Sequence, residues 1–214
     1  MVDLAHLRPL PKPSTTPAGQ RILLAASSLF YSQGIASTGL DLVVEHAGVT
    51  KRTLYQRFGS KDGLVCAYLT DRANRWQQLV LNRLDEADTA DLDLIDAVFD
   101  LTHEWIASNP RGCGFVNAWA ELGNDCGTAT KAVIQSEKRW MRTLFVALTG
   151  NTQTGELVHE LYEGALVCAA IFGDFDSLER AKIGARKLTA QPGNRQNEKA
   201  SRGSMTQNGD PDGT

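Results

Sequence analysis

The sequence contains no apolar run of about 18 residues, the minimum for a membrane-spanning helix, and no basic-then-apolar start typical of a secretory signal. Several enzyme motifs are also missing. There is no H-E-x-x-H metal site, no G-x-S-x-G nucleophile, no Walker loop and no dinucleotide-binding glycine pattern. We therefore expect a cytoplasmic protein without a membrane segment, which is not an enzyme and uses no metal or cofactor.

Paired cysteine motifs are absent as well. The four cysteines, Cys66, Cys113, Cys126 and Cys168, form no C-x-x-C pair and have no close histidine partner. In a cytoplasmic chain this spacing favours buried thiols over disulfides or zinc ligands. Redox sensing by Cys113 or Cys126 is the alternative.

The net charge is small, −3 over 214 residues, which by itself argues against a nucleic-acid partner. However, the charges are unevenly divided. Residues 1–62 carry seven Lys/Arg and four Asp/Glu, whereas the remainder carries 15 and 21. A basic N-terminal part on an acidic remainder is typical of a protein that binds phosphates with one end only.

Residues 34–64 predict two short helices with a tight turn between them. In the first helix, apolar residues from Leu40 to Ala47 recur at i, i+3, i+4 and i+7. Gly48 then permits a left-handed backbone that ends this helix, and Thr50 is suited to cap the next one. This arrangement predicts a helix-turn-helix.

The second short helix has one apolar face and one polar face. Leu54 and Phe58, four residues apart, would point inward. The residues left exposed would be Lys51, Arg52, Tyr55 and Gln56. Two cations and two hydrogen-bonding side chains on one short face fit a recognition helix in the major groove.

The residues of this segment follow the pattern G-x-x-x-T-x-L-x-x-V-x-x-x-A-G-V-T-K-x-T-L-Y-x-x-F-x-S-K-[DE]-x-L. This pattern resembles the signature of the TetR (tetracycline-repressor-like) transcriptional regulators. The resemblance implies that residues 51–56 lie in the groove and that Thr38, Tyr55 and Lys61 hold phosphates. The implied DNA-binding set is Thr38, Thr50, Lys51, Arg52, Thr53, Tyr55, Gln56 and Lys61.

Two positions depart from the family pattern. Gly39 stands where Ser or Thr usually caps the first short helix, which puts one phosphate contact in doubt. Arg52 replaces a small residue and would alter which base is read.

The remaining sequence predicts an all-α protein: a long helix from Ser60 to about Leu84, a polar break at residues 85–91, and further helices. Residues 111–123 are expected to form a buried helix, and an R-G-C-x-x-x-N-A-x-x-E segment there resembles one branch of the TetR family. Residues 149–154 are expected to be a loop.

We divide the chain into a flexible basic and proline-rich arm (1–17), a helix-turn-helix domain (18–62), a ligand-binding and dimerisation domain (63–190) and a disordered tail (191–214). The arm either is a loose terminus or reaches along DNA.

Small residues such as Gly164 and Ala169 recur on the last two predicted helices, and small residues allow two helices to approach closely. One chain has a single reading helix, so a two-fold dimer is needed to reach two major grooves about 34 Å apart. We therefore expect a homodimer that pairs through these two helices, which in the family form a four-helix bundle between subunits.

Aromatic and polar residues of the second domain could line a pocket for a small molecule. The candidates are Trp76, His103, Trp105, Phe115, Asn117, Trp119, Trp140 and Tyr162. His103 and Asn117 are the expected orienting groups because they are polar on otherwise apolar stretches. The alternative is that these residues only fill the core.

The expected function is that of a TetR-type regulator, a repressor released from a palindromic double-stranded DNA operator by an unidentified small-molecule effector. Two alternatives remain open: a transcriptional activator, and a helical ligand carrier or enzyme that keeps the fold without DNA binding. The polar and basic face at residues 51–56 argues against the second alternative, because a carrier has no need for it.

Overall fold

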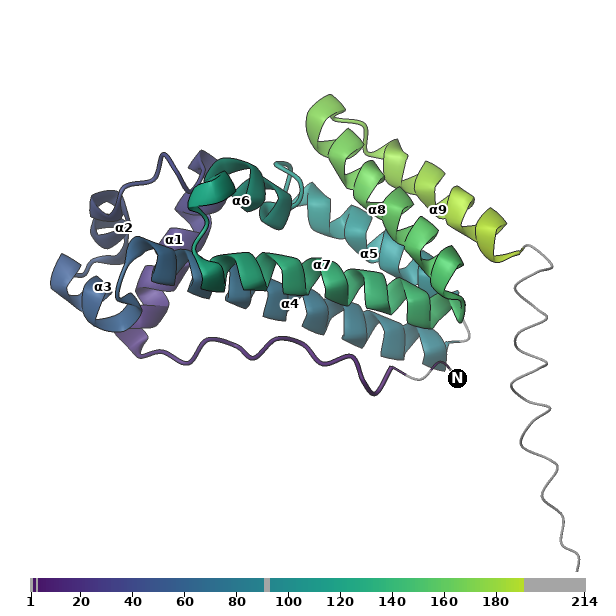
Figure 1. The fold of residues 1–214 in the computed structure, drawn as a ribbon, viewed down its shortest axis with the longest axis horizontal. Coiled ribbons are helices and arrows are strands. Elements are labelled where there is room, and N and C mark those ends of the chain that lie inside the picture. The colour runs from purple at the N-terminus through teal and green to yellow at the C-terminus, as the bar shows by residue number, and fades with distance from the viewer. Residues whose placement is uncertain (1, 3, 91–92, 191–214) are drawn as a thin grey trace, which may run out of the picture.

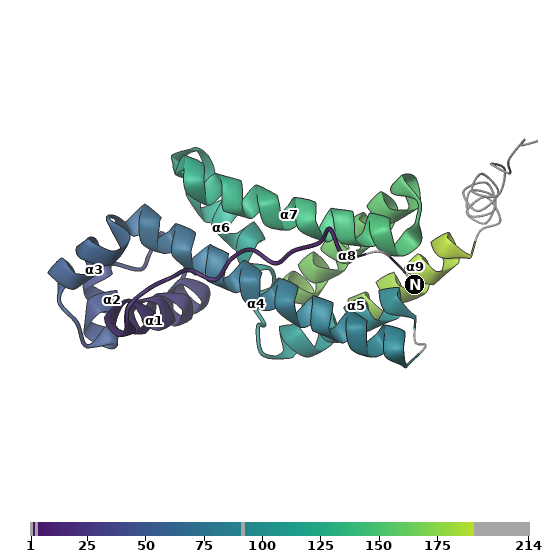
Figure 2. The same ribbon diagram turned by 90° about the horizontal axis from the view of Figure 1, so that it is seen from below.

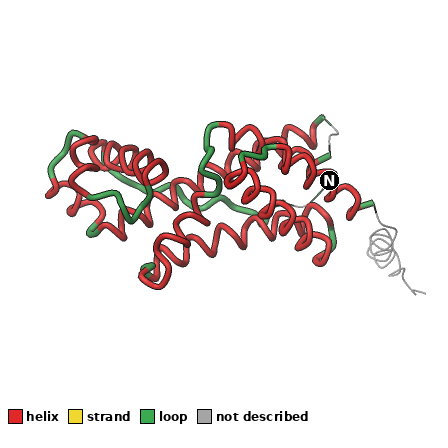
Figure 3. Tube along the Cα trace, turned by 90° about the horizontal axis from the view of Figure 1, so that it is seen from above, coloured by secondary structure: helices red, strands yellow, loops and turns green. Residues whose placement is uncertain are grey.

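The computed structural model of this chain describes residues 2, 4–90 and 93–190, and within these ranges it contains helices and loops but no strand (Figures 1 and 3). This confirms the all-α prediction. The elements are α1 (Pro17–Gln33), α2 (Leu40–Ala47), α3 (Lys51–Phe58), α4 (Lys61–Thr89), α5 (Leu94–Ala107), α6 (Gly114–Leu122), the short 3-10 helix η1 (Gly123–Asp125), α7 (Thr128–Thr149), α8 (Thr152–Phe172) and α9 (Asp176–Thr189). None of the described helices has the length and apolarity needed to cross a bilayer.

The ends of the short helices follow the local sequence signals. Gly48 ends α2 in the left-handed region with φ 60°. The Thr50 hydroxyl accepts a hydrogen bond from the Thr53 N–H at the start of α3, and the Ser60 hydroxyl accepts one from Gly63 at the start of α4. Gly39 precedes α2 and offers no side-chain cap.

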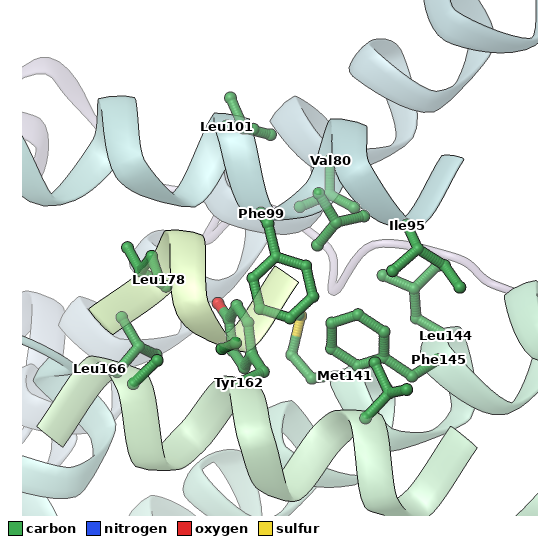
Figure 4. Packing of buried hydrophobic residues seen from close by; sticks show 14 of the residues in the cluster. Val80, Ile95, Phe99, Leu101, Met141, Leu144, Phe145, Tyr162, Leu166 and Leu178 are labelled. Carbon is green, nitrogen blue, oxygen red and sulfur yellow. The ribbon is translucent and has the colours of Figure 1, made fainter. Parts of the chain in front are cut away.

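Two apolar clusters organise the molecule. The head core joins α1, α2, α3 and the first part of α4 to residues of α6 and α7, with Ile22, Val43 and Leu54 fully buried. The body core joins the rest of α4 to α5, α7, α8 and α9 around a group of packed rings (Figure 4). Phe145 lies 6.0 Å from Phe99 and 5.3 Å from Tyr162 between ring centroids.

Helix α4 belongs to both cores. Leu64 is buried in the head, and Val80 and Leu84 are buried in the body. The predicted end near Leu84 and the polar break at 85–91 are wrong, because α4 continues to Thr89. Ala87 is buried as well, so packing against the body continues the helix through a segment whose local composition is polar.

The N-terminal arm is extended, as its prolines predict, but it is not a loose terminus. It runs along α4 and α7 away from α3 (Figures 1 and 2). The Leu10 N–H donates to Gln77 Oε1 at 2.7 Å, and Asn74 donates to the Leu10 carbonyl at 2.6 Å. Trp140 Nε1 donates to the Arg8 carbonyl at 3.1 Å, so the arm lies against the body rather than beside α3.

Two further predictions need correction. Helix α6 was expected to be buried, but Val116 and Trp119 are exposed and only one of its faces packs inward. The loop expected at 149–154 shrinks to two residues, because Asn151 caps α8 directly. The predicted tail at 191–214 lies outside the described residues.

Gly155 fixes the close approach of α7 and α8. A Cβ at this position would lie 2.4 Å from the Val146 Cα, a backbone atom that cannot move aside alone. We expect Gly155→Ala to lower the free energy of unfolding by about 1–3 kcal/mol, measured by urea denaturation. Gly164→Ala on the same helix meets nothing within 4 Å in its own chain and should leave the packing of α8 against α7 unchanged. Equal effects of the two changes would contradict this account.

Candidate nucleic-acid interface and effector cavity

Helix α3 presents the exposed face that its sequence predicts. Lys51, Arg52, Tyr55 and Gln56 are all exposed, while Leu54 is fully buried. The Thr50 and Thr53 hydroxyls lie 3.0 Å apart at the start of the helix. The side chains available at the surface are therefore two cations, a phenol and an amide.

Lys51 has an ionic partner on the neighbouring helix. Its Nζ lies 2.6 Å from Asp41 Oδ1, and both side chains are mostly exposed. The hydrogen bond and charge of Asp41 raise the pKa of Lys51. A phosphate or base that binds Lys51 would have to compete with Asp41.

Two of the expected phosphate contacts are engaged inside the protein. Thr38 is fully buried, and its hydroxyl donates to the Gly34 carbonyl at 2.6 Å, so the prediction that it holds a phosphate is wrong in this conformation. The loop after α1 turns this side chain inward to bond the end of that helix. Lys61 is half-buried, with a lowered pKa due to burial, and donates to the Ala36 carbonyl at 3.3 Å.

Sequence reasoning missed Arg57, which is exposed in the last turn of α3. Its position next to Gln56 in a two-turn helix was the available signal. Gly39 also leaves space at the start of α2, since a Cβ there would meet nothing within 4 Å. Uncapped backbone N–H groups at a helix start favour anions.

This head matches known proteins. A family model described as "Bacterial regulatory proteins, tetR family" matches residues 22–68, from α1 into α4. The solved structure of a TetR-family transcriptional regulator from Streptomyces coelicolor is similar at 26% identity and TM-score 0.68, over 80% of this chain and 94% of that one. The head of this chain is therefore of the TetR type, and the fold of the chain resembles that of a TetR-family regulator.

Two other comparisons extend this result. The reduced form of E. coli NemR is similar in fold, with TM-score 0.72 and 21% identity over 83% of this chain and all of that one. The transcriptional activator FasR from Mycolicibacterium smegmatis is 43% identical over 49 residues. That match spans 23% of this chain and 22% of FasR, so it covers about a fifth of the curated relative.

The body of this chain contains a cavity of about 40 Å³ between α4, α5, α6, α7 and α8. Four of the predicted pocket residues line it, namely Trp76, Trp105, Phe115 and Tyr162. Sequence reasoning missed its charged groups, which are Arg72, Glu137, Lys138 and Glu163.

The other four predicted pocket residues do not face this cavity. His103, one of the two expected orienting groups, is exposed beside α9. Asn117, the other, donates to the Arg111 carbonyl at 2.9 Å and lines a separate surface hollow. Trp140 is buried against the arm, and Trp119 is 43% exposed. Each lies on a helix that contributes to the cavity wall, but its side chain is not among those that line the cavity.

Trp119 instead borders a groove of about 480 Å³ between α6 and α7. The groove is lined by Phe115, Val116, Trp119, Ile134, Gln135, Lys138 and Arg139. Phe115 and Lys138 also line the cavity, so the two spaces share a wall. A volume of this size lies within the range of small-molecule sites.

The cavity charges are partly matched. Both carboxylate oxygens of Glu163 accept hydrogen bonds from Lys138 Nζ, at 2.8 and 2.6 Å. Burial disfavours the charged form of Lys138, but Cys113, 3.3 Å away, and Glu163 outweigh it and raise its pKa. Burial also raises the pKa of Glu137 to about 7, although Gln77 donates a hydrogen bond to it. No group of three metal-ligating side chains occurs in the described ranges.

The four cysteines were expected to be buried thiols, but each is only partly buried and none forms a disulfide. Cys113 lies at the cavity wall. Burial raises the pKa of Cys66 and of Cys126.

The body also holds the head directly. Glu121 of α6 accepts hydrogen bonds from the backbone N–H groups of Ile35 and Ala36 in the loop before α2. Arg111 donates to the Tyr31 carbonyl of α1. Thr130 of α7 donates to Asp62 Oδ1 at 2.8 Å in the first turn of α4. Movement of α6 or α7 would therefore reach the helix-turn-helix.

The buried Glu137 predicts a dependence of stability on pH. Its pKa of about 7 in the folded protein lies above the ordinary 4.5, so the folded state binds the proton more tightly between these values. The contribution of Glu137 to the free energy of unfolding is fully present below pH 4.5 and is lost as the pH rises through about 7. We expect Glu137→Gln to raise the free energy of unfolding at pH 8 by up to about 3 kcal/mol and to change it little at pH 4.5.

Urea unfolding at the two pH values measures this difference. Glu160→Gln, at an exposed position of α8, is the matched control and should behave like the parent. The same gain for Glu137→Gln at both pH values would show that ionisation of Glu137 is not its cause.

Proposed function

We propose that this protein is a homodimeric DNA-binding regulator of the TetR family, most simply a repressor, that binds a palindromic operator and is released by a small-molecule effector. The exposed set Lys51, Arg52, Tyr55 and Gln56 on α3, in a head of TetR type, carries the proposal. The basic N-terminal part of the chain supports it, because phosphates attract such a surface.

The proposed dimer uses the outer face of α8 and α9. Large apolar side chains are exposed there: Leu157, Leu161, Val167, Ile171, Phe172, Phe175 and Ile183. Ile171 and Phe172 are 70% and 76% exposed. An apolar surface of this extent is typical of an interface. It lies away from the head (Figure 1), so pairing there leaves both α3 helices free for DNA.

The proposed switch acts through the contacts between body and head. An effector in the body would favour one arrangement of α4, α6 and α7, and the Glu121 contact with residues 35–36 would pass the change to the head. An effector shifts DNA affinity only by its own difference in affinity for the two arrangements. DNA must weaken effector binding by the same factor.

Activation of transcription is the second candidate function, because FasR, whose matched segment is similar, is named as an activator. Transcription measured in vitro from a promoter that carries the selected operator separates the two candidates. The operator is obtained by selecting bound DNA from random sequence.

Base-reading and phosphate-binding residues should respond differently to substitution. We expect Arg52→Ala to change the preference at one base pair of the operator by about 1–3 kcal/mol. Lys61→Ala should weaken binding to specific and random DNA alike. It should also reduce the slope of log affinity against log salt concentration by about one. Fluorescence anisotropy with both DNAs at several salt concentrations measures these effects. If both variants shift specific and random DNA equally, the assignment of roles is wrong.

The apolar outer face makes dimerisation sensitive to charge. We expect Ile171→Glu to convert the dimer to monomer in sedimentation velocity and to lower operator affinity, because a buried unpaired carboxylate is costly. Leu24→Glu places the same charge on an apolar side chain of α1 that is 61% exposed and should leave the dimer intact. A dimer that survives Ile171→Glu would place the interface elsewhere.

A further inference from the structure

Arg72 of α4 is a buried cation with few partners. Arg72 is only 6% exposed, and its side chain lines the body cavity. Its Nη2 donates to Asn109 Oδ1 at 3.0 Å, and the guanidinium lies 4.5 Å from the Tyr31 ring centroid and 5.4 Å from that of Trp105. Among the described residues, no carboxylate forms an ion pair with it. A guanidinium has five N–H donors, and buried charges are ordinarily paired.

The other charged groups of the cavity do not supply the missing anion. Glu163 is committed to Lys138 through both of its oxygens. Glu137 receives the Gln77 amide and is about half protonated at neutral pH. Well below neutral pH, where Glu137 is protonated, the cavity therefore has one positive charge in excess, and that charge belongs to Arg72.

The surroundings of Arg72 suit a flat apolar group. The Trp76 and Trp105 ring centroids are 5.3 Å apart, and Ile106, Phe115 and Met141 complete the apolar walls. The cavity of about 40 Å³ has room for a small head group, whereas the adjoining groove of about 480 Å³ has room for a larger body. Phe115 stands between the two spaces and lines both.

We propose that Arg72 recognises the anionic group of the effector, and that the effector is a small carboxylate carrying a flat apolar body. The carboxylate meets the planar guanidinium in the cavity, since the two groups match in a bidentate arrangement. The body extends past Phe115 into the groove between α6 and α7. The assignment deepens the proposed function and rests on its effector site.

A carboxylate bound at Arg72 would also affect contacts between body and head. Arg72 stacks on Tyr31 of α1, and the Tyr31 hydroxyl donates to the Gly112 carbonyl at 3.2 Å. At the start of α6, a Cβ on Gly114 would come 2.7 Å from Arg72 Nε, so this helix packs directly on the arginine. A carboxylate that takes hydrogen bonds from Arg72 changes its contacts with both elements.

The ionisation of Glu137 gives the site a pH dependence. The groups that face Glu137 are Arg72 and Gln77 from α4, Lys138 from α7, and Tyr162 and Glu163 from α8, with His159 next to Glu163. Above pH 7 the ionised Glu137 repels a second carboxylate and offsets Arg72. Carboxylate affinity should therefore fall by about tenfold between pH 6 and pH 8.5, and Glu137→Gln should remove this fall.

Isothermal titration calorimetry of the full chain with 1-naphthoate and 4-phenylbutyrate, each beside its primary amide, tests the proposal. The carboxylates should bind at least about tenfold more tightly than the amides. Arg72→Gln should abolish this preference and Arg72→Lys should keep part of it. Arg75→Gln, on the same helix but exposed, should keep all of it. Thermal unfolding of each variant confirms that it is folded.

Three results would overturn the proposal: equal affinity for acid and amide, undiminished carboxylate binding by folded Arg72→Gln, or no carboxylate binding up to about 10 mM. Operator binding is measured on the same samples. DNA binding without carboxylate binding rejects this inference and leaves the proposed DNA-binding function standing. Carboxylate binding that leaves DNA affinity unchanged supports Arg72 as the anion site and rejects control of DNA binding by the effector.

Discussion

The continuity of α4 is the constraint on which the other features depend. This helix of 29 residues is buried in the head core at one end and in the body core at the other. At about 1.5 Å per residue it spans roughly 44 Å without a break. Arg72 lies between the two buried ends, with Tyr31 of the head on one side and Trp105 of the body on the other. Because α4 is packed into both cores, a change in how the body packs against α4 also shifts the head.

The charges follow the division of the molecule into head and body. The head exposes Lys51, Arg52 and Arg57 around α3, while Asp41 on the neighbouring α2 is paired with Lys51. In the body, ion pairs such as Arg142 with Glu156 join α7 to α8 across the surface. Pairs of exposed groups contribute little to stability. Their sign still matters, because an acidic body does not compete with the head for phosphates.

The sequence predicts those features that depend on local periodicity and turn chemistry. Thr50, Gly48 and Ser60 set helix ends through contacts within four residues, and the exposed face of α3 follows from spacing alone. Features set by packing between distant segments are missed. Thr38 turns inward because the loop before α2 folds onto α1, and His103 faces solvent because α5 presents its opposite face to the core.

The charged residues of the cavity were overlooked because Arg72, Glu137 and Lys138 resemble surface residues in a one-dimensional sequence. Two of them nevertheless carry a signal. Arg72 precedes the buried Trp76 by four positions, and Glu137 precedes the buried Met141 by four, so each lies on the apolar stripe of its own helix. A charge on such a stripe must be paired, neutralised or reserved for a ligand. Glu137 is partly neutralised through its raised pKa, Lys138 is paired with Glu163, and only Arg72 is left for the third outcome.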